Sequence, residues 1–171
     1  TQIPTPFAIC DGYWQSHQYF EGIAGTIRTE LMPTPDVATR VSDLMRQIDG
    51  RDSIAVHVRR GDYVTNARTA EAHGSLDSSY HLQGVTEIVE GLSHPVALVF
   101  SDDPQWTEAN LSLDLEAIHV ESQGSLTPIA TLALMARCNH HVIANSSLSW
   151  WGAYLAEHES QQVIYPENWF R

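Results

Sequence analysis

The hydrophobic residues of this chain fall into two alternating patterns. Short apolar runs bounded by polar residues predict five strands, one beginning at residue 54 and the others over 96–100, 117–120, 141–144 and 162–165. Between them, apolar residues recur at helical spacing over 77–91, after 104, over 129–138 and from 147 onward. Alternating strands and helices predict an α/β fold with a doubly wound parallel sheet of about five strands, a Rossmann-like domain.

Two further helices are predicted before the first strand. Ser16 can cap a helix whose apolar residues recur at helical spacing until Pro33. Thr34-Pro35 then offers a cap and a first-turn proline for a second helix, which ends at Gly50. We therefore interpret residues 1–52 as a helical segment leading into the domain, and residues 53–171 as the domain itself.

The first strand runs directly into a basic segment. Strand alternation places His57 and Arg59 on one face, while Arg60 begins a turn that Gly61 permits. In an open α/β sheet, ligands bind at the carboxyl ends of the strands. Nine basic residues serve a chain with 21 carboxylates, so two adjacent arginines here form a local positive site. The expected ligand is an anion, in particular phosphate.

The fourth predicted strand delivers Ser146 and Ser147 to the start of a helix. With the common strand order 3-2-1-4-5, strands one and four are neighbours at the point where the winding reverses. The crevice there would be lined by both serines and by Arg59 and Arg60. Because a helix N-terminus presents free N–H groups and a positive dipole end, the sequence predicts a phosphate cradle at this point.

Composition excludes several classes of protein. The net charge of −12 argues against a general nucleic-acid binder. The sequence has no lysine, which excludes a P-loop, a pyridoxal Schiff base and a protein kinase site. The apolar stretch at 129–136 is too short to cross a bilayer, and the N-terminus has no signal-peptide pattern. Since the chain starts without methionine, we expect further sequence upstream.

Several residues have a structural as well as a functional interpretation. Asp102 and Asp103 could hold magnesium, contact a ligand or cap the helix after Pro104; capping is the default for one of them, and a metal role is the weakest alternative. His140-His141 has no cysteine or carboxylate at ligand spacing, which favours a structural role. Trp150-Trp151 is typical of a core, although one ring could wall a pocket.

Four motifs together carry a resemblance to a known family. They are Gly12-Tyr-Trp-Gln-Ser16, His57-Val-Arg-Arg-Gly-Asp-Tyr63, Phe100-Ser-Asp-Asp103 and Asn145-Ser-Ser-Leu-Ser-Trp-Trp-Gly-Ala-Tyr154. In this order they closely resemble the α-1,2-fucosyltransferases of glycosyltransferase family 11. The resemblance implies a GT-B-like enzyme that transfers L-fucose from GDP-fucose to the 2-hydroxyl of a galactoside with inversion, using neither a metal nor another cofactor. This chain resembles the C-terminal, donor-binding half, and the family's N-terminal half is missing from it.

The resemblance also implies roles for individual residues. Arg59 would clamp the β-phosphate as the main catalytic cation. Asp62 is the best candidate in this segment for the base that deprotonates the acceptor, and an acid or histidine in the missing half is an equal alternative. Relatives often carry an aspartate where this chain has Thr131, which leaves guanine selectivity open. The predicted donor-binding residues are His57, Arg59, Arg60, Ser101, Asp102, Asp103, Asn145, Ser146 and Ser147.

The expected partners are GDP-fucose and a galactose-containing glycan, with no nucleic acid. We expect a bacterial protein that is cytoplasmic or associated with the membrane periphery through parts outside this segment. Two alternatives stay open: a non-catalytic nucleotide-sugar-binding module, and a Rossmann-like transferase that uses another nucleotide sugar. As a half of the enzyme, the chain should bind GDP weakly and transfer no fucose.

Overall fold

The structure is a computed structural model, and it describes residues 11, 16–61, 64, 66, 71, 74, 76–120 and 126–169. The chain divides into two compact units, Thr1–Leu31 and Met32–Arg171. Within the first unit, the 3-10 turns η1 (His17–Tyr19) and η2 (Glu21–Ile23) precede the short helix α1 (Ala24–Glu30).

The prediction of one continuous helix from Ser16 is wrong. Ser16 makes no side-chain capping hydrogen bond, and φ is −137° at Phe20 and −125° at Ile23, outside the helical range. Gly22 and Gly25 lie in this stretch, and each glycine costs a helix about 1 kcal/mol relative to alanine. The apolar spacing is therefore helical, while the backbone preference breaks the helix into short pieces.

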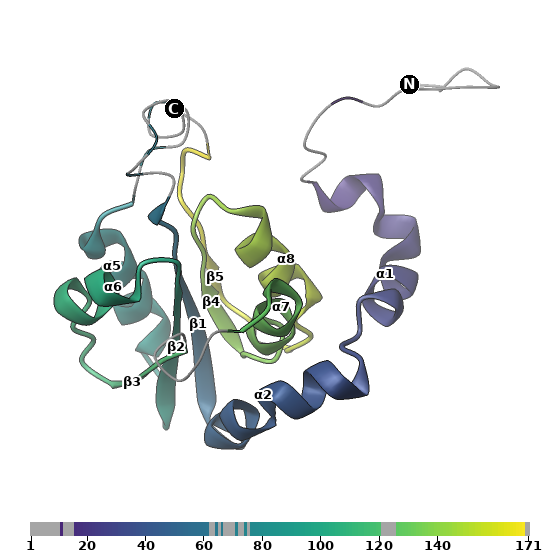
Figure 1. Ribbon diagram of the computed structural model, residues 1–171, viewed down its shortest axis with the longest axis horizontal. Helices are drawn as coiled ribbons and strands as arrows, with labels where there is room; N and C mark the ends of the chain where they lie inside the picture. The colour runs from purple at the N-terminus through teal and green to yellow at the C-terminus, as the bar shows by residue number, and fades with distance from the viewer. Residues whose placement is uncertain are drawn as a thin grey trace. The chain divides into compact units, whose positions relative to one another are not determined.

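The second unit is built on a five-stranded parallel sheet (Figure 1). Its order is β3-β2-β1-β4-β5, which confirms the predicted order and the predicted reversal of winding between β1 and β4. The strands are β1 (Asp52–Val58), β2 (Pro95–Ser101), β3 (Glu116–His119), β4 (His140–Val142) and β5 (Val163–Ile164). The last two strands are shorter than the apolar runs that predicted them.

Helices lie on both faces of this sheet (Figure 1). They are α2 (Pro35–Ile48), α5 (Ser78–Val89), α6 (Pro104–Asn110), α7 (Pro128–Met135) and α8 (Ser147–Leu155). The side chains of Asp77, Asp103 and Thr127 cap α5, α6 and α7, whereas Thr34 makes no capping bond and α2 begins at its first-turn proline.

Two hydrophobic clusters cover the two faces of the sheet, because successive residues of a buried strand point to opposite sides. Ala55, Leu98 and Phe100 pack with α2 and α7, while Ile54 and Val56 pack on the other face with α5. Helix α2 belongs to the second unit, although it lies in the segment predicted to lead into the domain. The predicted division of the chain into a leading segment, residues 1–52, and a domain, residues 53–171, stays a prediction.

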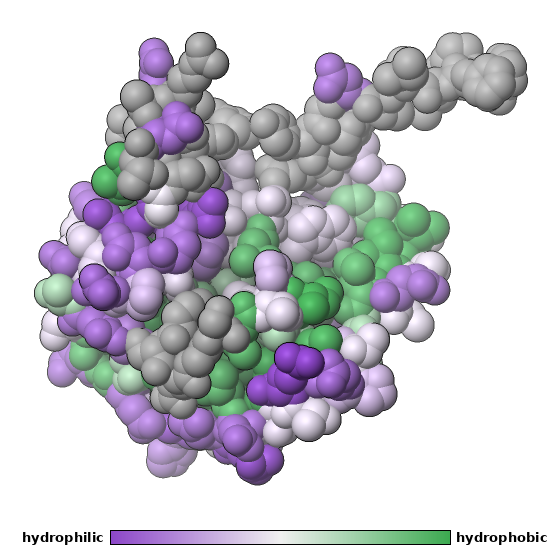
Figure 2. All heavy atoms as spheres, viewed as in Figure 1, coloured by the Kyte–Doolittle hydropathy of each residue, from purple (hydrophilic) through white to green (hydrophobic). Residues whose placement is uncertain are grey.

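Figure 2 shows one face of the molecule, on which polar side chains gather over α5 and α6 and apolar side chains over α7 and α8. Of the large apolar side chains on α7, Ile129 is exposed. Throughout the part of the chain that the structure describes, no helix combines the length and the apolar character needed to cross a membrane.

Candidate anion-binding site

The candidate site is formed where β1 and β2 end. Parallel register pairs His57 with Phe100 and Val58 with Ser101, so the segments that follow the two strands leave the sheet side by side. One segment carries Arg59 and Arg60, and the other carries Asp102 and Asp103. Because Val58 and Phe100 are fully buried, the core fixes the point at which both segments begin.

Asp102 holds the backbone and one side chain of the basic segment. Its Oδ2 lies 2.8 Å from Nη1 of Arg59, and its Oδ1 accepts a hydrogen bond from the Arg60 N–H at 2.8 Å. Gly61 follows, and a Cβ at this position would lie 2.7 Å from Oδ2 of Asp102. The close approach of a carboxylate therefore favours glycine here, since among the described residues a left-handed backbone occurs at Gly50, Gly74 and Gly91 and not at Gly61.

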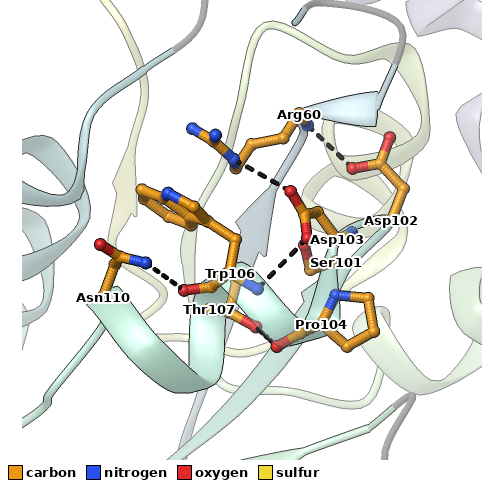
Figure 3. A network of polar contacts seen from close by, with 8 residues as sticks. All are labelled: Arg60, Ser101, Asp102, Asp103, Pro104, Trp106, Thr107 and Asn110. Atoms are coloured by element: carbon orange, nitrogen blue, oxygen red, sulfur yellow. Dashed lines mark hydrogen bonds and ion pairs between the residues drawn. The ribbon is translucent and has the colours of Figure 1, made fainter. Parts of the chain in front are cut away.

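Asp103 joins Arg60 to the start of α6 (Figure 3). Its Oδ1 accepts from the Trp106 N–H at 3.2 Å, which confirms the predicted helix cap, and its Oδ2 lies 3.4 Å from Nε of Arg60. The Arg60 guanidinium carbon lies 3.9 Å from the centroid of the Trp106 ring, a cation–π contact. Oγ of Ser101 accepts from the Asp103 N–H at 2.9 Å, so Ser101 holds the backbone of the residue whose carboxylate faces Arg60.

The second half of the site lies at the end of β4, which pairs directly with β1. Ser146 is the N-cap residue of α8 but makes no side-chain capping bond, and Ser147 is the first residue of the helix. The first N–H groups of a helix have no partner within it and can bind an anion. Asn145 is buried, and its Nδ2 donates to the Trp169 carbonyl at 3.3 Å, a contact that anchors the segment before α8.

His57 lies in β1, two residues before Arg59 in the sequence. It is 6% exposed, and its Nδ1 is buried without a hydrogen-bond partner among the described residues. Burial is the main cause that lowers the pKa of His57 to about 4, and the nearby positive charge of Arg59 acts in the same direction. The side chain is therefore neutral at pH 7 and can offer a hydrogen-bond donor or acceptor without adding charge.

Helix α5 holds the ends of β1 and β4, a feature that sequence reasoning missed. Nε2 of His81 lies 3.2 Å from the His57 carbonyl oxygen, and the Tyr80 hydroxyl donates to the Ile143 carbonyl at 2.7 Å. Both residues follow the N-cap residue Asp77 within the first turn of α5. Two adjacent polar aromatic residues at the start of a helix were the available signal, but sequence spacing does not indicate which strand ends they contact.

The structure thus brings most of the predicted site residues to one edge of the sheet. Arg59, Arg60, Ser101, Asp102 and Asp103 are connected by the contacts given above, and residues 145–147 follow the strand paired with β1. Asp62, the candidate base, lies outside the described residues. The role of each residue toward a ligand stays a prediction.

Four further residues that the sequence analysis singled out take no part in the contacts given above. Thr131 is buried within α7. His141 is also buried, with Nε2 2.9 Å from the Met135 carbonyl oxygen, in keeping with its structural interpretation. Trp150 and Trp151 are partly buried rather than core residues, and Trp150 stacks on Tyr154 at 5.3 Å between ring centroids.

Among the described residues, no cluster of three or more His, Cys, Asp or Glu side chains could hold a metal ion. Asp102 and Asp103 instead face the two arginines. The expectation that the reaction needs no metal stays a prediction.

A doubly wound sheet with paired arginines at its switch point defines a Rossmann-like domain with a candidate anion site. The chain belongs to Glycosyl transferase family 11, whose sequence profile matches residues 2–170. This result confirms the resemblance drawn from the motifs.

Known relatives agree with the family and with the fold. The chain is 32% identical over 165 residues to an α-1,2-colitosyltransferase of Escherichia coli, covering 93% of this chain and 55% of the relative. It is 30% identical to a galactoside 2-α-L-fucosyltransferase of Caenorhabditis elegans, covering 90% of this chain and 44% of the relative. The crystal structure of POFUT1 in complex with GDP-fucose matches with a TM-score of 0.57 at 16% identity, over 79% of this chain and 47% of that one, a likeness of fold. The chain spans about half the length of the curated relatives it matches.

Proposed function

We propose that this chain carries the donor-binding part of an inverting α-1,2-fucosyltransferase, which transfers L-fucose from GDP-fucose to the 2-hydroxyl of a galactoside. The observation that carries the proposal is the arrangement of Arg59 and Arg60 at the end of β1, each held by a carboxylate from the neighbouring strand. The names of the relatives from E. coli and C. elegans, which contain α-1,2-colitosyl and 2-α-L-fucosyl transfer, support this linkage.

Geometry rather than net charge would hold the diphosphate. Two arginines and two aspartates face one another, so their formal charges cancel before a ligand arrives. The aspartates fix the guanidinium groups in place, and fixed donors stabilise developing charge without reorganising during the reaction. A guanidinium also matches phosphate oxygens in a planar fork, which an ammonium group cannot do.

The main chemical requirement of the transfer is stabilisation of the GDP leaving group. Cleavage of the bond between fucose and GDP leaves a diphosphate with growing negative charge, which Arg59, Arg60 and the N-terminus of α8 can receive. The sugar becomes oxocarbenium-like, and the acceptor hydroxyl attacks the opposite face and loses its proton to a base. Asp62 is the proposed base within this segment. We propose that no metal is required, because the fixed guanidinium donors and the helix end stabilise the charge that develops on the diphosphate.

The proposed acceptor is a galactose-containing glycan, and the proposed setting is bacterial, with peripheral membrane association through parts outside this segment. Similarity to an E. coli relative supports the bacterial origin. That relative is named for colitose, so a donor carrying this sugar is the second candidate.

A transfer assay tests the proposal. The whole protein to which this chain belongs would be incubated with a β-galactoside and either GDP-fucose or GDP-colitose, and the product analysed by mass spectrometry and linkage analysis. A 2-linked deoxyhexose product supports the proposal and identifies the sugar. Tight GDP binding without any product would favour the non-catalytic module, and preference for UDP or ADP over GDP in competition would favour a different nucleotide sugar.

A further inference from the structure

The side chain of Arg60 is more enclosed than that of its neighbour Arg59. It is 16% exposed, compared with 36% for Arg59. The backbone N–H of Arg60 is bound by Asp102, its Nε faces Asp103, and its guanidinium carbon lies over the ring of Trp106. These contacts leave few directions in which the end of the side chain can point.

Its two Nη nitrogens are the groups that remain available. Among the described residues, neither has a recorded hydrogen-bond partner, and neither belongs to the buried nitrogens that lack one. Figure 3 shows this end of the guanidinium turned away from Asp102 and Asp103. Arg60 therefore keeps two outward donors in a side chain that is otherwise enclosed.

A single carboxylate sets the position of both the arginine and the ring. Oδ1 of Asp103 caps α6 through the Trp106 N–H, and Oδ2 faces Arg60 Nε. The Thr107 hydroxyl donates to the Pro104 carbonyl at 2.9 Å, and Asn110 Nδ2 donates to the Trp106 carbonyl at 2.9 Å, so both ends of this short helix are tied (Figure 3). The ring thus approaches the guanidinium from a fixed helix.

We propose that Trp106 is a positioning residue that holds the Nη groups of Arg60 toward the phosphates of the donor, and so sets the preference of the site for a nucleoside diphosphate over the bare nucleoside. This inference rests on the proposed function, because it assumes that the nucleotide binds at this edge of the sheet. The ring restricts a rotamer-rich side chain before the ligand arrives, so less freedom is lost on binding. The Trp106 ring also leaves the Nη groups of Arg60 without a hydrogen-bond acceptor among the described residues, whereas a second carboxylate in its place would accept hydrogen bonds from them.

A purely structural Trp106 would behave differently. The ring packs against the cluster that contains Leu111 and Val99, so its loss would disturb α6 in any case. A general loosening should weaken the binding of every ligand by a similar factor. A positioning role should weaken the binding of phosphorylated ligands selectively.

The experiment compares GDP and guanosine binding to the wild-type chain and to variants, by calorimetry and ligand-observed NMR, in samples shown to be folded by circular dichroism. Trp106→Leu should weaken GDP binding about tenfold, a difference of about 1.4 kcal/mol, and should change guanosine binding less than about twofold. Trp106→Phe keeps an aromatic face and should restore most of the GDP affinity. Thr39→Ala, which removes the bond from the Thr39 hydroxyl to the Pro35 carbonyl on the exposed side of α2, is the matched control and should alter neither affinity.

If Trp106→Leu folds poorly, Trp106→Met replaces it as the apolar variant. A double-mutant cycle then combines this variant with Arg60→Gln. The effect of Arg60→Gln on GDP binding should be much smaller when the ring is absent. Equal loss of GDP and guanosine affinity, or additive effects in the cycle, would overturn the positioning role while leaving the donor site intact. A wild-type chain that binds no GDP would instead refute the proposed function, and this inference with it.

Discussion

Replacing Gly61 with alanine tests how the two arginines are held. The new Cβ would lie 2.7 Å from Oδ2 and 3.2 Å from Cγ of Asp102, and real Cβ atoms essentially never come as close as the shorter distance. The Asp102 side chain is 27% exposed, so it can swing toward solvent rather than force the backbone apart. We therefore expect a folded variant in which the carboxylate has left its place.

The cost can be estimated from the contacts that would be lost. The hydrogen bond from the Arg60 N–H to a charged acceptor is worth about 1.5–3 kcal/mol, and the part-exposed ion pair with Arg59 adds at most about 1 kcal/mol. Some of this is recovered when the freed groups are hydrated, so the free energy of unfolding should fall by about 1–2 kcal/mol. Affinity for GDP should fall about tenfold, because the guanidinium of Arg59 and the backbone of Arg60 both lose the carboxylate that positions them.

Calorimetric titration of GDP and urea unfolding would be measured for Gly61→Ala, Asp102→Ala and the double variant. Once Asp102 is shortened to alanine, the new Cβ has nothing to displace, so Gly61→Ala should cost little in that background. The coupling between the two changes should be about 1 kcal/mol or more. Gly25→Ala is the matched control, since a Cβ there meets nothing within 4 Å. Additive effects of Gly61→Ala and Asp102→Ala would refute the close-approach explanation.

The remaining predictions concern charge, metal and pH. Arg59→Lys should weaken GDP binding nearly as much as Arg59→Ala, by about 2–5 kcal/mol, because an ammonium cannot form the planar fork; unchanged affinity by calorimetry would show that Arg59 is not the clamp. Transfer by the whole protein should survive EDTA, and activity lost with EDTA and restored by magnesium would place a metal at Asp102 and Asp103. Burial lowers the folded-state pKa of His57 and His141 to about 4 from 6.5, so the unfolded chain takes up protons first as the pH falls. Stability should therefore be fully present above pH 6.5 and decline between pH 6.5 and 4, by up to about 3 kcal/mol per histidine; urea midpoints that stay constant over this range, at constant m, would contradict these values.

Strand order and site location could be predicted because they follow from local patterns and general rules of chain connection. The apolar runs identified every strand of the sheet, and the common strand order predicted that β1 and β4, which lead to Arg59 and Ser146, are neighbours. Capping of α6 by one residue of the Asp102-Asp103 pair was equally visible, since it depends on residues three positions apart.

Contacts between distant segments could not be predicted in the same way. Arg60 and Asp102 are 42 residues apart, and their hydrogen bond depends on the register of β1 against β2, which the apolar runs leave uncertain by a residue or more. The stacking of Trp106 on Arg60 depends further on the direction in which α6 leaves β2. The prediction of one helix from Ser16 was wrong for a local reason. It followed the apolar spacing and left out the cost of two glycines to a helix.

The most direct test of the central claim is a calorimetric titration of GDP into this chain, with UDP, ADP and guanosine as competitors, in a sample whose folding is confirmed by circular dichroism. The account predicts saturable one-to-one GDP binding that is weak, stronger than that of guanosine, and strongly reduced in Arg59→Ala. Absence of GDP binding in the folded wild-type chain, or binding that Arg59→Ala leaves unchanged, would contradict the placement of the donor site at the end of β1.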